Sequence, residues 1–179
     1  TTSSGLGSGT VAYTVDSNAT ANSRSGTLTA GGQTYTISQA GVGCTYTLSA
    51  TNGNHTSAQE TNSFTVTSPV GCAWTAVTNA TWIQTASTGN GNGTVTYVVS
   101  ANNTTNSRSG TITVGSQTFT VNQAGVVCAY TLSATSASHG AGAESGGFGV
   151  STTPGCAWNA STAQAWIHTT SSGTGNGTV

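Results

Sequence analysis

The sequence NSRSGTLT at residues 22–29 returns as NSRSGTIT at residues 106–113, 84 positions further along the chain. The longer stretch ISQAGVGCTYTLSAT at residues 37–51 returns in the same way as VNQAGVVCAYTLSAT at residues 121–135. Both matches have the same offset, so no insertion or deletion interrupts the register. Self-similarity at a fixed period indicates tandem structural repeats.

Single residues of structural or chemical interest keep this offset. They are the pairs Cys44/Cys128, Cys72/Cys156, Trp74/Trp158, Trp82/Trp166, Arg24/Arg108, Gln39/Gln123, His55/His139 and Glu60/Glu144. The period divides the 179 residues into a complete repeat at 42–125, the C-terminal half of a repeat at 1–41 and the N-terminal part of the next repeat at 126–179. No separate linker follows residue 125, so we expect neighbouring repeats to be closely coupled.

Apolar residues alternate with Thr and Ser through each repeat, a pattern typical of half-buried strands. Cys72 and Trp74, for example, alternate with Ala73 and Thr75. Clusters of Gly, Asn and Ser punctuate about seven short strands per period, the count expected of an immunoglobulin-like sandwich. We therefore predict an all-β chain of tandem immunoglobulin-like β-sandwiches with an 84-residue repeat.

Charged residues make up only 3% of the chain, with two Arg, no Lys and three acids, whereas soluble domains average about 25%. Such a surface suits a secreted protein rich in hydroxyl groups, and equally a surface that packs against copies of itself. Two Arg residues cannot form a phosphate-binding patch, so nucleic acid is not an expected partner. No apolar run is long enough to span a membrane. No signal peptide is visible, so we expect the true N-terminus to lie upstream of residue 1.

The four cysteines recur at fixed phases, which indicates disulfides formed in an oxidising, extracellular compartment. We expect the local pairs Cys44–Cys72 and Cys128–Cys156, each closing 28 positions within one repeat. The alternative pairing, Cys72–Cys128, would join adjacent repeats. Zinc does not fit, because no C-x-x-C pair exists and His55 is not spaced like a ligand.

Six motifs of the complete repeat resemble a BACON domain in their order and spacing. They are CTYTLSA at 44–50, GCAWTA at 71–76, ATWI at 80–83, GNGTVTY at 91–97, RSGTITV at 108–114 and FTVNQAG at 119–125. The resemblance implies an immunoglobulin-like β-sandwich in secreted or surface bacterial proteins. Such modules are often appended to carbohydrate-active enzymes or strung in arrays, and they are suspected of binding glycans or mucin. No catalytic domain accompanies the modules here, and the family offers no well-established binding residues to carry over.

The inventory of chemically active residues argues against catalysis. Residues 42–125 hold one acid (Glu60), one Arg (Arg108) and one His (His55). Glycoside hydrolysis ordinarily needs two carboxylates, and a Ser-His-Asp triad needs an Asp. We predict no enzyme activity, no metal and no cofactor.

The charged residues of the repeat have a ligand-binding interpretation and a structural one. Glu60 and Arg108 could together bind a ligand, but a lone ion pair between two strands or two modules is favoured. His55 lies in the loop at 52–56, where we expect it to be exposed to solvent.

The tryptophans are the only candidate platforms for stacking a sugar. Trp74 shares a face with Cys72, so it is expected in the core. Trp82 and its equivalent Trp166 are candidate glycan-stacking residues if they point outward. The alternative is that they pack under a loop or against the next module. Asn-x-Ser/Thr sequons arise readily in so Asn/Thr-rich a sequence; they include Asn18, Asn54, Asn79, Asn92, Asn103 and Asn159.

These observations favour a non-enzymatic extracellular structural or adhesive protein, a segment of a filament, fibre or stalk; carbohydrate binding is the alternative. The expected partners are copies of the chain or adjacent repeats, with glycans as the alternative. The two end fragments complement each other, with an overlap of 169–179 against 1–11. A window cut from a continuous array explains this better than strand exchange between copies, because the overlap would be redundant in an exchange.

Overall fold

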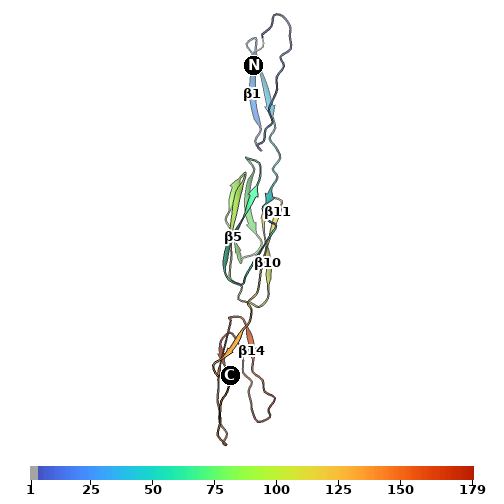
Figure 1. Cartoon of the computed structure of the whole chain (residues 1–179). Coiled ribbons are helices and arrows are strands. Elements are labelled where there is room, and N and C mark those ends of the chain that lie inside the picture. The colour runs from blue at the N-terminus through green and yellow to red at the C-terminus, as the bar shows by residue number, and fades with distance from the viewer. Residues whose placement is uncertain (1–3) are drawn as a thin grey trace.

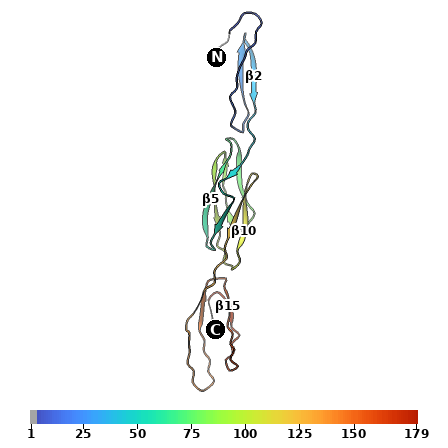
Figure 2. The ribbon, with the colours of Figure 1, turned by 45° about the vertical axis from the view of Figure 1, so that its right-hand side comes forward.

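The computed structural model describes residues 4–179, which form strands, turns and loops and contain no helix. The all-β prediction is therefore confirmed for this part of the chain. Three parts follow one another along a long axis (Figures 1 and 2). We call them the head (residues 4–41), the centre (residues 42–125) and the tail (residues 126–179).

The centre consists of two sheets that face each other. The first sheet has five strands, in the order β4 (Asn52–His55), β11 (Gln117–Gln123), β10 (Arg108–Val114), β6 (Ala73–Thr78) and β8 (Thr88–Asn90). The second sheet has four strands, in the order β3 (Thr47–Leu48), β5 (Glu60–Thr67), β9 (Gly93–Val99) and β7 (Ile83–Gln84). Strands β10 and β11 form an antiparallel hairpin of seven residue pairs, and β4 joins β11 in parallel.

Alternate residues of these strands point into one core between the sheets, as the pleat of a strand requires. In β9, for example, Val95, Tyr97 and Val99 are buried. Phe64 of β5 stacks on Phe119 of β11 with ring centroids 4.3 Å apart, so this contact joins the two sheets. The other buried members of the core are Val66, Trp74, Ala76, Ile83, Ile112, Val114 and Val121.

The position of the Trp74 indole explains why Gly89 and Gly93 stand on either side of the turn between β8 and β9. Its Nε1 donates a hydrogen bond of 2.8 Å to the carbonyl of Gly91. The indole lies so close to Gly89 and Gly93 that a Cβ at either position would come within 2.5 Å of a ring atom. Only glycine permits this approach, and the tail repeats the arrangement around Trp158.

The disulfides pair within each repeat, as expected. Cys44 is bonded to Cys72, and Cys128 is bonded to Cys156. The alternative Cys72–Cys128 linkage between repeats does not form. Cys72 is fully buried, and the buried Trp74 lies two residues further along the chain, as the shared face predicted.

The head and the tail contain only some of the strands that the period predicts, and neither closes a core; residues 9–15, for example, are equivalent to β9 but form no strand. In the head, β1 (Arg24–Ala30) and β2 (Gln33–Gln39) form a hairpin with the same seven-pair register as β10 and β11. Among residues 4–179, no other strand pairs with this hairpin. The tail forms two small sheets, one of β12 (Tyr130–Leu132), β13 (Gly149–Thr152) and β16 (Gly177–Thr178), the other of β14 (Ala157–Asn159) and β15 (Ser172–Thr174).

The outer strands of both central sheets are short. The edge strands β3, β4, β7 and β8 span two to four residues each. Short edges offer few free backbone groups to another sheet, which limits association side by side. Within residues 4–179, no helix is long and apolar enough to cross a membrane.

Replacing Cys44 and Cys72 together by Ser should lower the free energy of unfolding of the centre by about 3.5 kcal/mol. The bond closes a loop of 28 positions, and its loss returns that loop-closure entropy to the unfolded chain. Urea unfolding followed by the fluorescence of the buried Trp74 measures the change. The matched control, Cys128→Ser with Cys156→Ser, should leave this transition in place; an equal loss in both variants would contradict the assignment.

Candidate functional site

A chain of hydrogen bonds runs from the core to the surface of the centre. His55, at the end of β4, has its side chain fully buried, and its Nε2 lies 3.1 Å from the hydroxyl of Tyr97. Its Nδ1 lies 2.9 Å from a carboxylate oxygen of Glu60. The expectation of an exposed His55 is therefore wrong, because strand β4 turns the imidazole inward against the edge of the Tyr97 ring.

Glu60 is held in its charged form by donors that surround it. Its carboxylate accepts hydrogen bonds from the Thr56 hydroxyl, from His55 and from the Thr56 amide. The Thr56 hydroxyl is the largest cause, and together these donors lower the pKa of Glu60 from its ordinary value of 4.5 to about 2. Since an ionised carboxylate only accepts, we assign the proton of His55 to Nδ1, which leaves Nε2 to accept from Tyr97. Burial raises the pKa of Tyr97, and the charge of Glu60 raises it further.

Arg108 has partners of its own, so the expected Glu60–Arg108 ion pair is wrong. Its Nε donates to Gln123 at 2.8 Å, and its Nη2 donates to the carbonyls of Ser100 and Ala101 at 2.6 and 3.1 Å. Those carbonyls and the side chain of Gln123 supply the acceptors that a carboxylate would have supplied. Burial lowers the pKa of Arg108.

Trp82 lies beneath this guanidinium. The Arg108 Cζ is 4.4 Å from the centroid of the Trp82 ring, in a cation–π arrangement. The ring is half-buried and packs against the core residues. One face of the candidate glycan platform is therefore occupied by Arg108.

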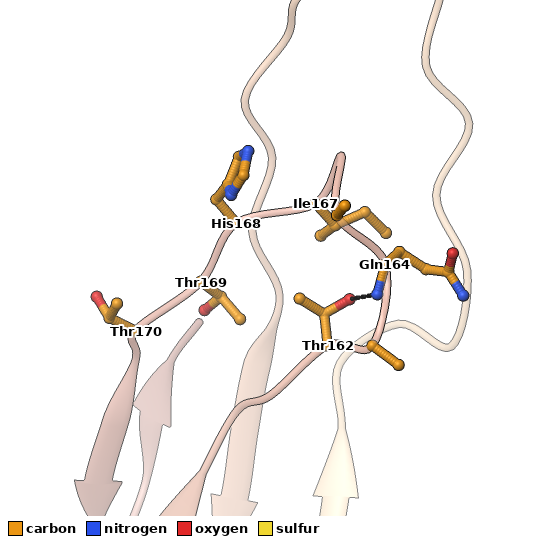
Figure 3. Close-up of a pocket in the computed structure, with 8 residues that line it drawn as sticks. Thr162, Gln164, Ile167, His168, Thr169 and Thr170 are labelled. Atoms are coloured by element: carbon orange, nitrogen blue, oxygen red, sulfur yellow. Dashed lines mark hydrogen bonds between the residues drawn. The ribbon is translucent and has the colours of Figure 1, made fainter.

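Trp166 occupies the equivalent position in the tail and is 78% exposed. Its neighbour Ile167 is 42% exposed, whereas the equivalent Ile83 is fully buried. The loop that carries Trp166, residues 162–170, borders a shallow hollow of about 430 Å³ that is open to solvent. Figure 3 shows Ile167 and His168 on this loop, and the hydrogen bond that the backbone amide of Gln164 donates to the hydroxyl of Thr162. The surroundings of the two tryptophans differ, since the described residues 126–179 contain no strand equivalent to β10 or β11.

Asn102 forms a second polar site, at the end of the centre that faces the tail. Its Nδ2 donates to the carbonyls of Asn106 and Ala124 at 2.8 and 3.0 Å. Its Oδ1 accepts from the amide and the hydroxyl of Thr104 at 3.2 and 2.8 Å. The side chain is 2% exposed and satisfies its full hydrogen-bonding capacity. It fastens the loop at 102–106 to the segment that leaves β11.

The same network recurs at the boundary between the head and the centre. Asn18 makes the equivalent four bonds, to Asn22, Ala40 and Thr20. Its sequon therefore carries a side chain that is nearly buried, with both amide hydrogens bonded. This role of Asn18 and Asn102 was not expected from the sequence. The signal was a pair of Asn-x-Thr motifs recurring with the period, at 18–20 and 102–104.

Each network touches the next repeat through its loop. The Ala21 amide donates to the Val70 carbonyl at 2.8 Å, and the Val42 amide donates to the Thr20 carbonyl at 2.8 Å. Gly71, at a φ of 93°, brings its backbone close to Asn22, where a Cβ would lie 3.1 Å from the amide nitrogen. At the second boundary the Val126 amide donates to Thr104 in the same way. These contacts define a candidate module junction rather than a site with catalytic chemistry.

No metal-binding arrangement accompanies these networks. Among residues 4–179, no group of three or more His, Cys, Asp or Glu side chains gathers to hold a metal ion. The polar atoms of both networks are already bonded to one another. The chemical role of the two networks is to fix the conformation of the loops that they connect.

Comparison with protein families assigns the class of the centre. Residues 73–124 match the family model BACON, described as "Putative binding domain, N-terminal". The centre is therefore a BACON-like domain, as the sequence motifs predicted.

Two solved structures are similar to parts of the chain. One is a Bacteroides ovatus GH5 xyloglucanase in complex with a XXXG heptasaccharide, with a TM-score of 0.42 and 19% identity over 46% of this chain and 19% of that one. The other is the surface layer protein SbsC, domains 4–9, with a TM-score of 0.32 and 15% identity over 73% of this chain and 23% of that one. The chain thus spans about a fifth of each structure. The search of curated proteins found no match.

Stability of the centre should fall as the pH drops from about 4.5 to about 2. A carboxyl whose pKa is lowered by folding stabilises the fold above its unfolded pKa, and that stabilisation disappears as the pH falls through the folded pKa. Urea unfolding of Glu60→Gln should show a smaller dependence on pH across this window. Glu144→Gln, which removes a carboxylate of the tail, is the control and should behave as the unaltered chain does. A pH dependence unchanged in Glu60→Gln would refute the role of Glu60.

Proposed function

We propose that the chain is a non-enzymatic structural segment of an extracellular array, in which immunoglobulin-like BACON sandwiches are joined end to end. In this array, residues 42–125 form one complete module, and residues 1–41 and 126–179 contribute to its neighbours. The modules act as spacers in a filament, fibre or stalk. The observation that carries the proposal is the Asn-centred network, which recurs bond for bond at both boundaries.

The connection between modules is short and held at both ends. Residues 124–128 lead from β11 to the next repeat; Asn102 bonds the carbonyl of Ala124, and Cys128 is bonded to Cys156. Between them, the Val126 amide is bonded to Thr104. A connection fastened at such intervals has little rotational freedom, unlike a flexible linker. Stiff coupling suits a module whose task is to set distance.

Two further features support an extracellular location and an association along the axis. Both cysteine pairs are oxidised, as is usual outside the cytosol. The near absence of charge removes the repulsion that keeps copies of a protein apart. The short edge strands disfavour lateral sheet pairing, which leaves the ends of the module as its contact surfaces.

Glycan binding through Trp82 is the weaker candidate. A pyranose needs an open aromatic face, and in the centre Arg108 stacks on this ring. A panel of glycans tested against the chain provides the check. Micromolar binding that is abolished by Trp82→Ala and retained in Trp74→Phe would replace the structural proposal with glycan recognition.

The junction can be tested with spin labels at Thr67 and Ser151, exposed positions one period apart. Cysteines introduced there in the oxidised chain should give a narrow distance distribution. Asn102→Ala removes two donated and two accepted hydrogen bonds, each worth about 1 kcal/mol, and should broaden the distribution. It should also speed hydrogen exchange at the Val126 amide.

Asn103→Ala is the matched control, because this neighbouring side chain is exposed. It should leave both the distances and the exchange unchanged. A broad distribution in the unaltered chain would overturn the spacer proposal.

A further inference from the structure

The loop at 20–22 of the head is bonded to the segment through which the chain enters the centre, residues 41–44 (the entry segment). The Val42 amide donates a hydrogen bond of 2.8 Å to the carbonyl of Thr20. A Cβ on Gly41 would collide with the backbone of this loop, so only glycine permits the contact. The entry segment is therefore fastened to the head before it reaches the first strand of the centre.

A second segment of the centre, the turn at 69–72, is bonded to the same loop. The Ala21 amide donates to the carbonyl of Val70 at 2.8 Å. The turn ends at Cys72, which is fully buried and whose carbonyl accepts a hydrogen bond of 2.9 Å from the Gly91 amide. The turn is therefore anchored in the body of the centre.

The disulfide between Cys44 and Cys72 joins these two segments. Within the described part of the chain, no hydrogen bond holds residues 43–45. The next attachment is the hydroxyl of Tyr46, which donates to the carbonyl of Ala73 at 2.7 Å. The disulfide is thus the first attachment of the entry segment to the body of the centre. We call the entry segment, the turn and this bond the clasp.

We propose that the disulfide of each repeat sets the angle between neighbouring repeats, and that its reduction by a thiol loosens the junction while the sandwich stays folded. The inference rests on the proposed function, because it names the residues that position the junction and the chemistry that regulates it. Cys44 and Cys72 act in it as positioning residues, through the loop at 20–22.

The clasp recurs at the second boundary. Cys128 is bonded to Cys156, and the Val126 amide donates to the carbonyl of Thr104 at 2.8 Å. The carbonyl of Cys156 accepts a hydrogen bond of 2.9 Å from the Gly175 amide, as its equivalent does in the centre. The two boundaries therefore share the disulfide, the bond to the preceding loop and the anchored turn.

The contact between the turn and the loop differs between the two boundaries. Pro154 stands at the position of Val70, and among residues 4–179 no hydrogen bond corresponds to the one that Val70 accepts. Instead, a Cβ on Gly155, at a φ of 88°, would collide with the Asn103 carbonyl. The turn therefore lies against the loop at both boundaries, with a hydrogen bond at the first and close packing alone at the second. A turn held by packing alone depends all the more on the disulfide.

The core of the sandwich does not include the disulfide. Neither cysteine lies in a strand, since β3 begins at Thr47 and β6 at Ala73. The cluster of buried side chains that joins the two sheets contains Trp74 but neither cysteine. Loss of the bond therefore removes no strand pairing and no contact within this cluster.

Reduction needs an external dithiol, such as dithiothreitol. Its thiolate attacks the sulfur of Cys44, because Cys44 is exposed whereas Cys72 is fully buried. The disulfide breaks, and Cys72 leaves as a thiolate that takes up a proton. The second thiol of the reductant then displaces Cys44, so the protein gains two electrons and two protons and the reductant becomes a cyclic disulfide.

Hydrogen exchange and spin labels on the full chain measure the positioning role. Replacing Cys44 by Ser and the buried Cys72 by Ala should speed exchange at the Val42 amide by roughly tenfold or more, because the entry segment can then open locally. It should also broaden the distance distribution between spin labels at Thr34 and Thr118, exposed positions one period apart. Dithiothreitol added to the unaltered, unlabelled chain should reproduce the faster exchange.

Cys128→Ser with Cys156→Ala is the matched control, because it removes the equivalent bond of the other junction. It should leave exchange at the Val42 amide unchanged and should speed exchange at the Val126 amide instead.

The fluorescence of Trp74 in the same samples reports whether the sandwich is folded. Unchanged exchange at Val42 after loss of the Cys44–Cys72 bond, or equal effects of both variants there, overturns the proposal. A centre that unfolds without denaturant when this bond is lost also overturns it, because the bond would then hold the sandwich itself. Each of these failures leaves the spacer proposal intact, since that proposal depends on the distances in the unaltered, oxidised chain.

Discussion

The core of the module depends on the contact between the β10–β11 hairpin and the sheet of β5 and β9. Phe119 stacks on Phe64 across this contact, and Ile112, Val114 and Val121 are fully buried against it. The chain also contains each partner without the other. The head has the hairpin with an exposed face, and the tail has the opposing strands around an open groove. Comparison of the head, the centre and the tail therefore shows which side chains this one contact buries.

In this protein, neutral polar side chains hold the loops in place, a task that charged side chains perform in many other proteins. Asn102 and Gln123 are nearly fully buried, and each bonds several backbone carbonyls or amides. Such groups are costly to bury unless every hydrogen bond is made, but once satisfied they specify a single local geometry. They carry no net charge, so they add no long-range repulsion between modules. This explains how a chain with 3% charged residues keeps well-defined loops.

The period and the alternation of apolar residues predicted the strands of the centre, the buried Trp74 and the local disulfides, because these features depend on neighbours in sequence or on the repeat. The contacts of His55 and Glu60 could not be predicted in this way. His55 lies in a polar stretch that reads as an exposed loop, and its buried partner Tyr97 is 42 positions away. The expected Glu60–Arg108 pair was wrong because charge alone does not reveal the backbone carbonyls and the Gln123 side chain that accept hydrogen bonds from the guanidinium. Asn102 was overlooked because an Asn in an Asn/Thr-rich loop resembles an ordinary turn residue.

The positions of the exposed apolar side chains determine where this module can associate with another. Along the sides, the edge strands are short and the outward faces carry hydroxyl groups that water solvates well, so lateral contact gains little. At the two ends of the chain, by contrast, large apolar side chains are exposed whose equivalents in the centre are buried. The hydrophobic effect is roughly proportional to the apolar area removed from water, so it acts on the ends and hardly on the sides. In the proposed array, these side chains are buried by the neighbouring repeats, as their equivalents are in the centre.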